Sequence, residues 1–298
     1  MARSRPNFSR VIKSFEASAT RGFSRSDLVS SFESNRLDWG LPSRMSAAAF
    51  LERLLQETKM SEVTLECTRY DDLIRYAWGA DTPPIHLALS IKRGAYCSHA
   101  TAMYAHGLGG DANTLFINSE QSEKPAFDSE LTQEAIDRAF RNKQRTSRLV
   151  YRYRDAKITV LSGKHTDRLG VERLKMPSGE EVEATSLERT LVDISVRPVY
   201  AGGVPAVLEA FRRARGRIST DTLLRVLKKL KHAYPYHQAI GFYMRRGGYP
   251  EGDQRRLKAL GTPFHFYLGH GLKPLEFDPE FKIYFPMSLN SSDSRRQQ

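Results

Sequence analysis

The N-terminal part of the chain alternates between apolar stripes at helical spacing and residues that interrupt helices. The first stripe consists of Phe8, Val11, Ile12 and Phe15. These positions follow i, i+3, i+4 and i+7 and predict an amphipathic helix, which Gly22 can end. A second short helix is predicted after Ser24, because Ser24 is a natural N-cap and Asp27 stands three positions later.

A third helix and a change of period follow. Gly40 and Pro42 break the chain, and Ser43 or Ser46 can cap a helix whose inward face carries Phe50, Leu51, Leu54 and Leu55. The segment EVTLECT then alternates apolar and polar residues, RYDD turns the chain, and LIRYAWG can return as a second strand. Three helices and a β-hairpin are the order of a winged helix-turn-helix, whose third helix enters the major groove and whose hairpin wing reaches the adjacent backbone.

The candidate DNA-contacting residues of this segment are the polar positions that remain once the core face is removed. They are Ser43, Arg44, Ser46 and Arg53 on the third helix, and Arg69, Tyr70 and Arg75 at the wing. The alternative is a winged helix used only for protein contact. The near-neutral charge of residues 1–80, with 12 Lys and Arg against 10 Asp and Glu, favours that alternative to some degree.

The pattern changes again at Pro83 and Pro84, which we interpret as an extended boundary between two domains. Beyond them, Ser98 can cap a helix, and strands are predicted at ANTLFINSEQ, at AKITVLSG and as a hairpin at LGVERLKMPSGEEVEATS. Thr185 and Glu188 fit a capping box for the next helix. The last third predicts amphipathic helices and late strands at FHFYLG and EFKIYFP.

The expected fold is therefore α+β, with an N-terminal winged helix-turn-helix followed by a larger mixed α/β domain. The expected DNA-binding domain covers residues 1–80, and the α/β domain with its basic helices covers residues 85–286. Residues 287–298 are polar and are expected to form a disordered tail.

Two segments contain residue types that are common in catalytic and metal sites. In YCSHATAMYAHGL, His99 and His106 stand one heptad apart, about 10.5 Å along a helix, which is too far for both imidazoles to bind one metal ion. Cys97 lies in no motif of a catalytic nucleophile. In TSLERTLVDISVRP, Arg189 and Asp193 are expected to form an i, i+4 ion pair rather than part of a catalytic acid cluster. We expect no catalytic residue, no metal site and no cofactor.

Composition narrows the class of protein. The chain is 40% hydrophobic and 27% charged, and no apolar run approaches the roughly 20 residues that span a bilayer, so no membrane partner is expected. The basic N-terminus lacks the apolar core of a secretory signal, which predicts a cytoplasmic location. Two cysteines cannot build a disulfide framework or a cysteine-rich zinc module.

The net charge of +12 is concentrated at the C-terminal end, where residues 191–298 carry 18 Lys and Arg against 9 Asp and Glu. The candidate basic patch, for DNA or a partner protein, consists of Arg212, Arg213, Arg215, Arg217, Arg225, Lys228, Lys229 and Lys231. Such runs are often solvated helix faces, and the competing interpretation is a surface for polyanions. A pI near 9.7 favours nucleic acid as a partner.

Three segments together resemble a known family. YCSHATAMYAHGL, TSLERTLVDISVRPVYAGGV and YPYHQAIGFYMRRGGY, in this order behind the expected winged helix, are similar to the AbiEi antitoxins of bacterial AbiE abortive-infection systems, which are type IV toxin–antitoxin systems. The resemblance runs from Phe8 to Pro286. The matching motif positions are Ser98, His99, Thr101, Ala102, His106, Gly107 and Leu108, and Glu188, Arg189, Thr190, Leu191 and Asp193.

This resemblance implies a transcriptional autorepressor that binds double-stranded operator DNA through its N-terminal domain. It also implies a C-terminal domain that counteracts a nucleotidyltransferase-like toxin encoded alongside. Two alternatives remain. One is a non-catalytic phage-defence or interaction protein. The other is a nuclease, for which the candidates Asp155, Lys157 and Asp193 are scattered through unlike elements.

Overall fold

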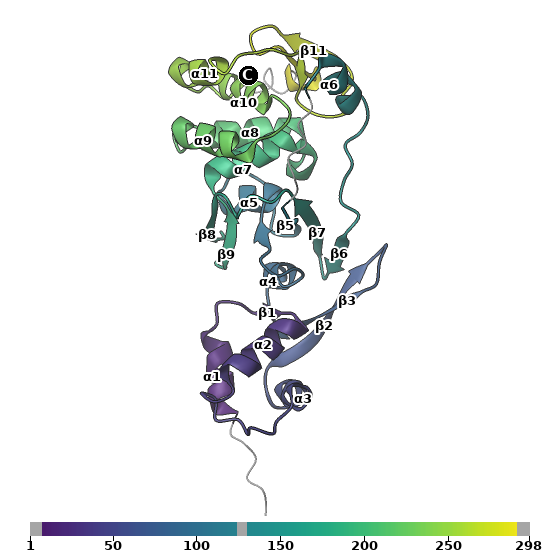
Figure 1. Cartoon of the computed structure of the whole chain (residues 1–298), viewed down its shortest axis with the longest axis vertical. Helices are drawn as coiled ribbons and strands as arrows, with labels where there is room; N and C mark the ends of the chain where they lie inside the picture. The colour runs from purple at the N-terminus through teal and green to yellow at the C-terminus, as the bar shows by residue number, and fades with distance from the viewer. Residues whose placement is uncertain (1–7, 124–129, 291–298) are drawn as a thin grey trace, which may run out of the picture. The chain divides into compact units, whose positions relative to one another are not determined.

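The computed structural model describes residues 8–123 and 130–290, and the chain forms two compact units. Unit 1 comprises the chain up to Ala95 together with a second segment, Arg148–Val160. Unit 2 comprises Tyr96–Ser147 and the chain from Leu161 onward. Both units contain helices and strands (Figure 1), so the predicted mixture of α and β structure is confirmed. None of the described helices has both the length and the apolar character that a bilayer crossing needs.

Unit 1 begins with three helices and a short strand, as the apolar periodicity predicts. They are α1 (Ser9–Ala17), β1 (Gly22–Phe23), α2 (Arg25–Asn35) and α3 (Ala47–Glu57). The predicted capping box of α2 is confirmed: Ser24 Oγ accepts the Asp27 N–H at 3.1 Å, and the Asp27 carboxylate accepts the Ser24 N–H at 2.8 Å. Ser46, and not Ser43, caps α3.

The strands of unit 1 are the first five of a nine-stranded sheet, in the order β1-β3-β2-β6-β7. The predicted hairpin is β2 (Met60–Cys67) with β3 (Leu73–Trp78), and in Figure 1 it extends beyond the three helices. β1 pairs with β3, and β6 (Val150–Tyr153) pairs with β2 and with β7 (Ala156–Gly163). The helices pack on this sheet through Phe8, Phe15, Phe23, Phe32, Trp39, Phe50 and Trp78.

The prolines interpreted as a domain boundary have a different role. Pro83 is the N-cap of helix α4 (Pro84–Leu89), and Pro84 is its first residue. Proline suits the first helical position because its φ is preset and its missing N–H would have had no partner there. The interpretation as an extended linker is therefore wrong, since α4 belongs to unit 1.

The last four strands of the nine-stranded sheet, in the order β5-β4-β9-β8, form one layer of unit 2. The strands are β4 (Tyr96–Cys97), β5 (Thr114–Glu120), β8 (Val171–Lys175) and β9 (Glu181–Thr185). The end of β7, from Leu161 to Gly163, lies beside β5, where the Gln121 N–H donates to the Gly163 carbonyl at 2.9 Å. The strands predicted from ANTLFINSEQ, AKITVLSG and the Pro-Ser-Gly hairpin are confirmed.

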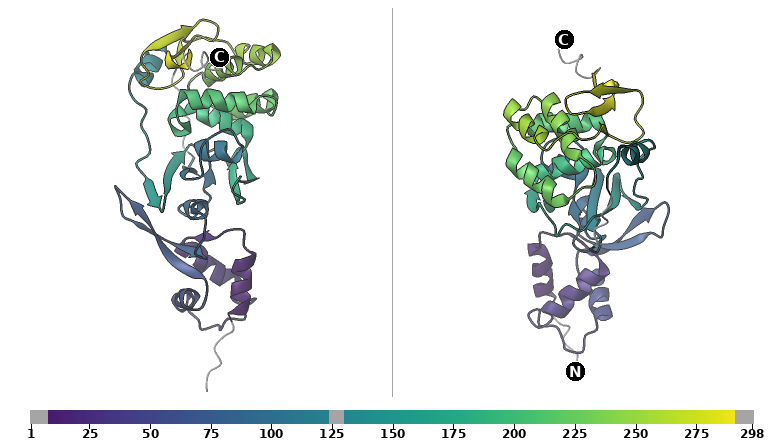
Figure 2. Two further views of the ribbon diagram at one scale, coloured as in Figure 1. Left: turned by 180° about the vertical axis from the view of Figure 1, so that it is seen from behind. Right: turned by 45° about the horizontal axis from the view of Figure 1, so that its top comes forward.

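Helices cover this sheet in successive layers, which Figure 1 and Figure 2 show from several sides. The helices nearest the sheet are α5 (His99–Ala105) and α7 (Leu187–Val196), followed by the 3-10 helix η1 (Pro198–Ala201). Beyond them lie α8 (Val204–Ala214) and α9 (Thr220–Leu230), then α10 (Tyr236–Arg246) and α11 (Glu251–Lys258). The N-cap of α7 is Ser186, one residue after the predicted Thr185, because Thr185 still belongs to β9.

A second, three-stranded sheet completes unit 2 together with α6 (Gln133–Phe140). Its order is β10-β12-β11, from Phe266–Tyr267, Ile283–Pro286 and Leu275–Asp278. The polar tail does not begin at residue 287, since Leu289 is fully buried in the core of unit 2 and the Asn290 side chain accepts a hydrogen bond from Arg246 at 2.8 Å. The rest of the expected tail, residues 291–298, lies outside the described residues.

Candidate functional site

The residues proposed for the groove helix lie mainly at its N-terminal end. Ser43 and Arg44 precede α3 in an exposed turn, and are not on the helix as the sequence interpretation places them. Ser46 is exposed and uses its hydroxyl to accept the Ala49 N–H at 3.1 Å. The segment immediately before α3 therefore presents Ser43, Arg44 and Ser46 to solvent.

Arg53 does not project from the helix as predicted. Its guanidinium lies 4.2 Å from the centroid of the Phe8 ring and forms an ion pair with Glu57 at 2.6 Å, which leaves its side chain only 18% exposed. Phe8 comes from the start of α1, so a tertiary contact holds Arg53 against the core edge. The exposed positions along α3 are instead Ala48, Glu52, Gln56 and Glu57.

The predicted wing residues differ in their exposure to solvent. Arg69 and Tyr70 lie exposed in the turn, with Tyr70 56% accessible. Arg75 is buried, and its guanidinium donates to the carbonyls of Ile74, Ser90 and Ile91 at 2.7, 3.1 and 3.0 Å. Burial lowers the pKa of Arg75 from its usual value. Arg75 is therefore a structural residue that satisfies backbone carbonyls and is wrong as a DNA-contact candidate.

The second segment of unit 1 adds cations that the sequence interpretation did not assign to it. Arg148–Val160 carries Arg148, Arg152, Arg154 and Lys157 against one acid, Asp155, and all five are exposed. Arg152 stands opposite Glu66 of the hairpin in the sheet register, and Lys157 stands opposite Arg152. Strand pairing between residues more than 80 positions apart, such as Glu66 and Arg152, was not predictable from the sequence.

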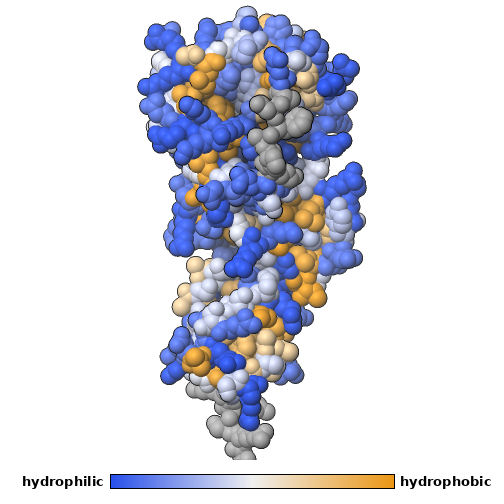
Figure 3. Space-filling view, viewed as in Figure 1, coloured by the Kyte–Doolittle hydropathy of each residue, from blue (hydrophilic) through white to orange (hydrophobic). Residues whose placement is uncertain are grey.

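The candidate basic patch lies on α8, α9 and the segment that joins them. In Figure 3, hydrophilic residues dominate the surface over the helical layers of unit 2. Four of the eight cations are engaged: Arg212 and Arg213 with Glu209, Arg215 with the Gly248 carbonyl and Arg217 with the His106 carbonyl. The four cations of α9 and its C-cap are exposed and have no ion-pair partner among the described residues: Arg225, Lys228, Lys229 and Lys231.

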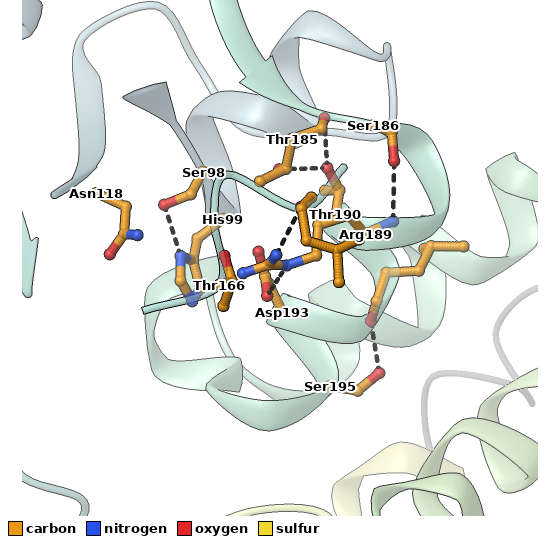
Figure 4. Close-up of polar contacts among 12 residues, drawn as sticks. Ser98, His99, Asn118, Thr166, Thr185, Ser186, Arg189, Thr190, Asp193 and Ser195 are labelled. Carbon is orange, nitrogen blue, oxygen red and sulfur yellow. Dashed lines mark hydrogen bonds and ion pairs between the residues drawn. The ribbon is translucent and has the colours of Figure 1, made fainter. Parts of the chain in front are cut away.

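Motif residues from two helices converge in unit 2 (Figure 4). The predicted ion pair is confirmed: Arg189 Nε donates to Asp193 Oδ1 at 2.8 Å, and the two side chains are 7% and 12% exposed. Arg189 Nη1 also donates to the Leu169 carbonyl at 2.7 Å. Burial would lower the pKa of Arg189, but the Asp193 carboxylate outweighs that effect and raises it.

Ser98 and His99 form a second polar contact in this region. The Ser98 side chain does not make the expected cap bond to α5, because its Oγ pairs with His99 Nδ1 at 2.9 Å. His99 adopts a φ of 50°, a left-handed conformation that few non-glycine residues take. Burial lowers the pKa of His99 to about 4, so the imidazole is neutral at pH 7. Asp193 bonds Arg189, and among the described residues no hydrogen bond joins a carboxylate to His99.

The two histidines of this segment serve different contacts. His106 uses Nε2 to bond the Thr185 carbonyl at 2.8 Å, while His99 bonds Ser98. Within residues 8–123 and 130–290, no group of three or more His, Cys, Asp or Glu side chains is arranged to hold a metal ion. The nuclease candidates are also divided, because Asp155 and Lys157 belong to unit 1 and Asp193 belongs to unit 2.

A cavity of about 820 Å³ opens beside these residues, and we name it the α7–α9 pocket. Its walls are Ser98 and His99, residues 118 and 121–123, the end of β7 with the loop that follows it (161–167), part of α7 and the end of α9. Its charged lining residues are Lys164, Arg189, Arg197, Lys229 and Lys231 against Glu123, Asp167 and Asp193. The pocket therefore carries an excess of positive charge.

His232 lines the pocket close to several of its charged residues. Burial lowers the pKa of His232 to about 4; Asp193 opposes this shift, whereas Arg189, Lys164 and Arg197 reinforce it. His232 Nε2 is buried without a hydrogen-bond partner in the described part of the chain.

Glu120 anchors the loop on the other side of the pocket. Its carboxylate accepts the backbone N–H groups of Thr166 and Arg168, at 2.9 and 3.2 Å, and the Thr166 hydroxyl. These hydrogen bonds outweigh burial and lower the pKa of Glu120. Asn118, Lys164, Arg197 and His232 were not identified from the sequence, because the segments that meet them in the pocket lie far away in the chain.

Comparison with known proteins identifies a fold. No family model matches the chain, and no curated protein matches it. Among solved structures, the crystal structure of the RV2827C protein from Mycobacterium tuberculosis is similar to this chain, with a TM-score of 0.55 and 12% sequence identity. The similarity covers 98% of this chain and 94% of that chain. At this level of identity, the similarity shows a shared fold.

Proposed function

We propose that the chain is a DNA-binding transcriptional autorepressor and antitoxin of a type IV, AbiE-like toxin–antitoxin system. Unit 1 binds the operator DNA of its own operon as a winged helix-turn-helix. Unit 2 counteracts a nucleotidyltransferase-like toxin encoded alongside. The observation that carries the DNA-binding proposal is the arrangement of α1, β1, α2, α3 and the hairpin β2–β3 around one aromatic core.

Exposure within unit 1 supports contact through the N-terminal end of α3. Ser43 and Arg44 are exposed there, and in helix-turn-helix proteins it is the N-terminal residues of the recognition helix that contact base edges. Farther along the helix, Glu52 and Glu57 are exposed, and their carboxylates would repel the phosphate backbone. We therefore expect DNA to meet α3 end-on rather than along its length.

The cations of Arg148–Val160 support the proposal in a second way. Residues 1–80 alone have a nearly balanced charge, but Arg148, Arg152, Arg154 and Lys157 add positive charge to the same unit. Arg69 and Tyr70 at the hairpin turn are free to contact a phosphate and a sugar. Non-specific attraction from these side chains would precede contact with the bases.

The antitoxin part of the proposal rests on the resemblance of the Ser98–Leu108 and Glu188–Asp193 motifs and on the exposed cations of α9. Lys228 and Lys229 lie in the last turn of α9, where they also suit the helix dipole. Their side chains face solvent and can dock an acidic surface.

The DNA-binding proposal is tested by gel retardation of the region upstream of the gene, with full-length protein and Mg²⁺ present. We expect retardation without degradation. Arg44→Ala should weaken binding by about 1–3 kcal/mol if Arg44 contacts a base. Lys13→Ala is the matched control, because Lys13 is an exposed cation on α1 and should change affinity much less.

Three results would contradict parts of this proposal. Equal losses from Arg44→Ala and Lys13→Ala would remove the end of α3 from the interface. Absence of retardation, with intact binding of a protein partner, would favour the interaction protein. Degradation of the DNA would favour the nuclease. The antitoxin part is tested separately, by growth of cells that express the neighbouring toxin gene with wild-type protein or with Lys228→Glu/Lys229→Glu.

A further inference from the structure

The α7–α9 pocket has the features of a ligand site that operator binding does not explain. Its volume of about 820 Å³ falls within the range of small-molecule sites, about 300–1,000 Å³. All of its lining residues belong to unit 2, whereas the candidate DNA contacts on α3 and the hairpin belong to unit 1. A ligand in this pocket would therefore be distinct from the operator.

The rim of the pocket offers cations that no protein group neutralises. Arg197, Lys229 and Lys231 are exposed, and none forms an ion pair in the described part of the chain. Lys164 is held differently, since its Nζ donates to the carbonyls of Leu230 and Lys231 at 3.3 and 3.4 Å, at the C-terminal end of α9. Three unpaired cations around one opening match a ligand with several negative charges.

The inner wall carries neutral polar side chains beside the Arg189–Asp193 ion pair. Ser98 and Asn118 are buried there, and Asn118 Nδ2 donates to the Tyr96 hydroxyl at 2.7 Å, which fixes the orientation of the amide. The His99 imidazole is neutral, and His232 contributes a buried Nε2 without a partner. Figure 4 shows Ser98, His99 and Asn118 beside the Arg189–Asp193 pair. Neutral donors and acceptors of this kind suit the hydroxyl and amide groups of a nucleoside.

We propose that the α7–α9 pocket binds a nucleoside polyphosphate. The phosphates lie against Arg197, Lys229 and Lys231 at the rim, and the nucleoside lies against the polar wall of Ser98 and Asn118. The pocket is larger than a phosphate chain needs, and this is the reason for assigning a nucleotide rather than inorganic polyphosphate. The left-handed φ of His99 is consistent with a ligand site, because backbone strain in folded proteins concentrates at such sites.

Calorimetric titration of the full-length protein at low salt tests the proposal, with ATP, GTP, CTP and UTP as separate probes. Inorganic triphosphate and a short single-stranded oligonucleotide are titrated in parallel. Lys229→Ala/Lys231→Ala removes two rim cations, and Arg225→Ala/Lys228→Ala removes two exposed cations of the same helix that do not line the pocket. All four side chains are exposed, so both variants should keep the wild-type melting temperature.

We expect at least one nucleotide to bind, and the Lys229/Lys231 variant to lose affinity by about tenfold or more, because charge-assisted contacts to phosphate are lost. The Arg225/Lys228 variant should change affinity by less than about threefold. Equal losses in the two variants would overturn the proposal, since they would indicate diffuse attraction to a basic helix.

Three further results would also overturn it. These are no binding of any nucleotide at about 1 mM, inorganic triphosphate binding as tightly as the best nucleotide, and an oligonucleotide that displaces the nucleotide. The last result would assign the pocket to the phosphates of a nucleic acid strand. Because operator retardation depends on unit 1, failure of nucleotide binding would leave the proposed function standing.

Discussion

Replacing Asp193 by Ala should destabilise unit 2 by about 3 kcal/mol, because it leaves the Arg189 charge buried without its counter-ion. Exposed ion pairs contribute about 0–1 kcal/mol, whereas breaking a buried pair costs about 3–5 kcal/mol. The side chains of Arg189 and Asp193 are 7% and 12% exposed, so the buried estimate applies. The low end of that range is appropriate because Arg189 keeps its hydrogen bond to the Leu169 carbonyl.

Two companion variants separate charge from packing. Asp193→Asn keeps an oxygen that can accept from Arg189 and should cost about 1.5 kcal/mol, the difference between a charged and a neutral acceptor. The double variant Arg189→Met/Asp193→Leu removes both charges, so neither is left buried without a partner. Its loss in free energy of unfolding should be smaller, by at least about 1.5 kcal/mol, than the summed losses of Arg189→Met and Asp193→Ala.

The positions of the tryptophans allow the unfolding of unit 1 to be followed separately. Trp39 and Trp78 are the two tryptophans of the chain, and both belong to unit 1. Urea unfolding followed by tryptophan fluorescence therefore reports unit 1, while far-UV circular dichroism follows the helices of both units. We expect Asp193→Ala to shift the dichroism transition and not the fluorescence transition. A loss below about 1 kcal/mol would refute the reasoning, because the pair would then behave as an exposed one.

Two further predictions concern stability. Burial lowers the pKa of His99 to about 4, with Asp193 opposing the shift and Arg197 and Arg189 reinforcing it. Below about pH 6.5, His99 is protonated in the unfolded chain but stays neutral in the folded chain. The free energy of unfolding should therefore be highest above that pH and should fall as the pH drops toward 4. Between pH 7.5 and 5 we expect His99 to account for about 2 kcal/mol of lost stability. His99→Gln should remove this contribution and leave the similar one of His232, whereas His265→Gln, at an exposed position, should retain both. Gly241→Ala should destabilise the protein by about 1–3 kcal/mol, because the added methyl group would overlap the buried Phe281 ring. The added methyl group of Gly252→Ala on α11 meets nothing within 4 Å, so this control variant should be neutral or stabilising. Equal melting temperatures for the two alanine variants would contradict this prediction.

Local patterns in the sequence predicted most of the helices and strands, because their causes are local. The Ser24–Asp27 capping box and the alternation in EVTLECT depend on residues a few positions apart, and both are present in the structure. The Arg189–Asp193 pair was predictable for the same reason, since i, i+4 neighbours meet on any helix.

The incorrect site residues depended on partners from elsewhere in the chain. Helical periodicity places Arg53 outside the main apolar stripe, but Phe8 of another helix covers it. Strand alternation likewise assigns Arg75 to one side of the hairpin without showing that the Ser90 and Ile91 carbonyls lie there. In both cases the sequence specified the direction of a side chain and a distant segment determined its exposure.

The charge of unit 1 depends on topology in the same way. Residues 1–80 carry 12 cations and 10 acids, so their charge is nearly balanced. If they were the whole of unit 1, any long-range attraction to DNA would have to come from the basic helices near the C-terminus. The chain returns to unit 1 at Arg148–Val160, and this segment brings four cations and one acid to the sheet that contains the hairpin. Unit 1 therefore has its own source of positive charge, and the exposed cations of α9 are available for a different ligand.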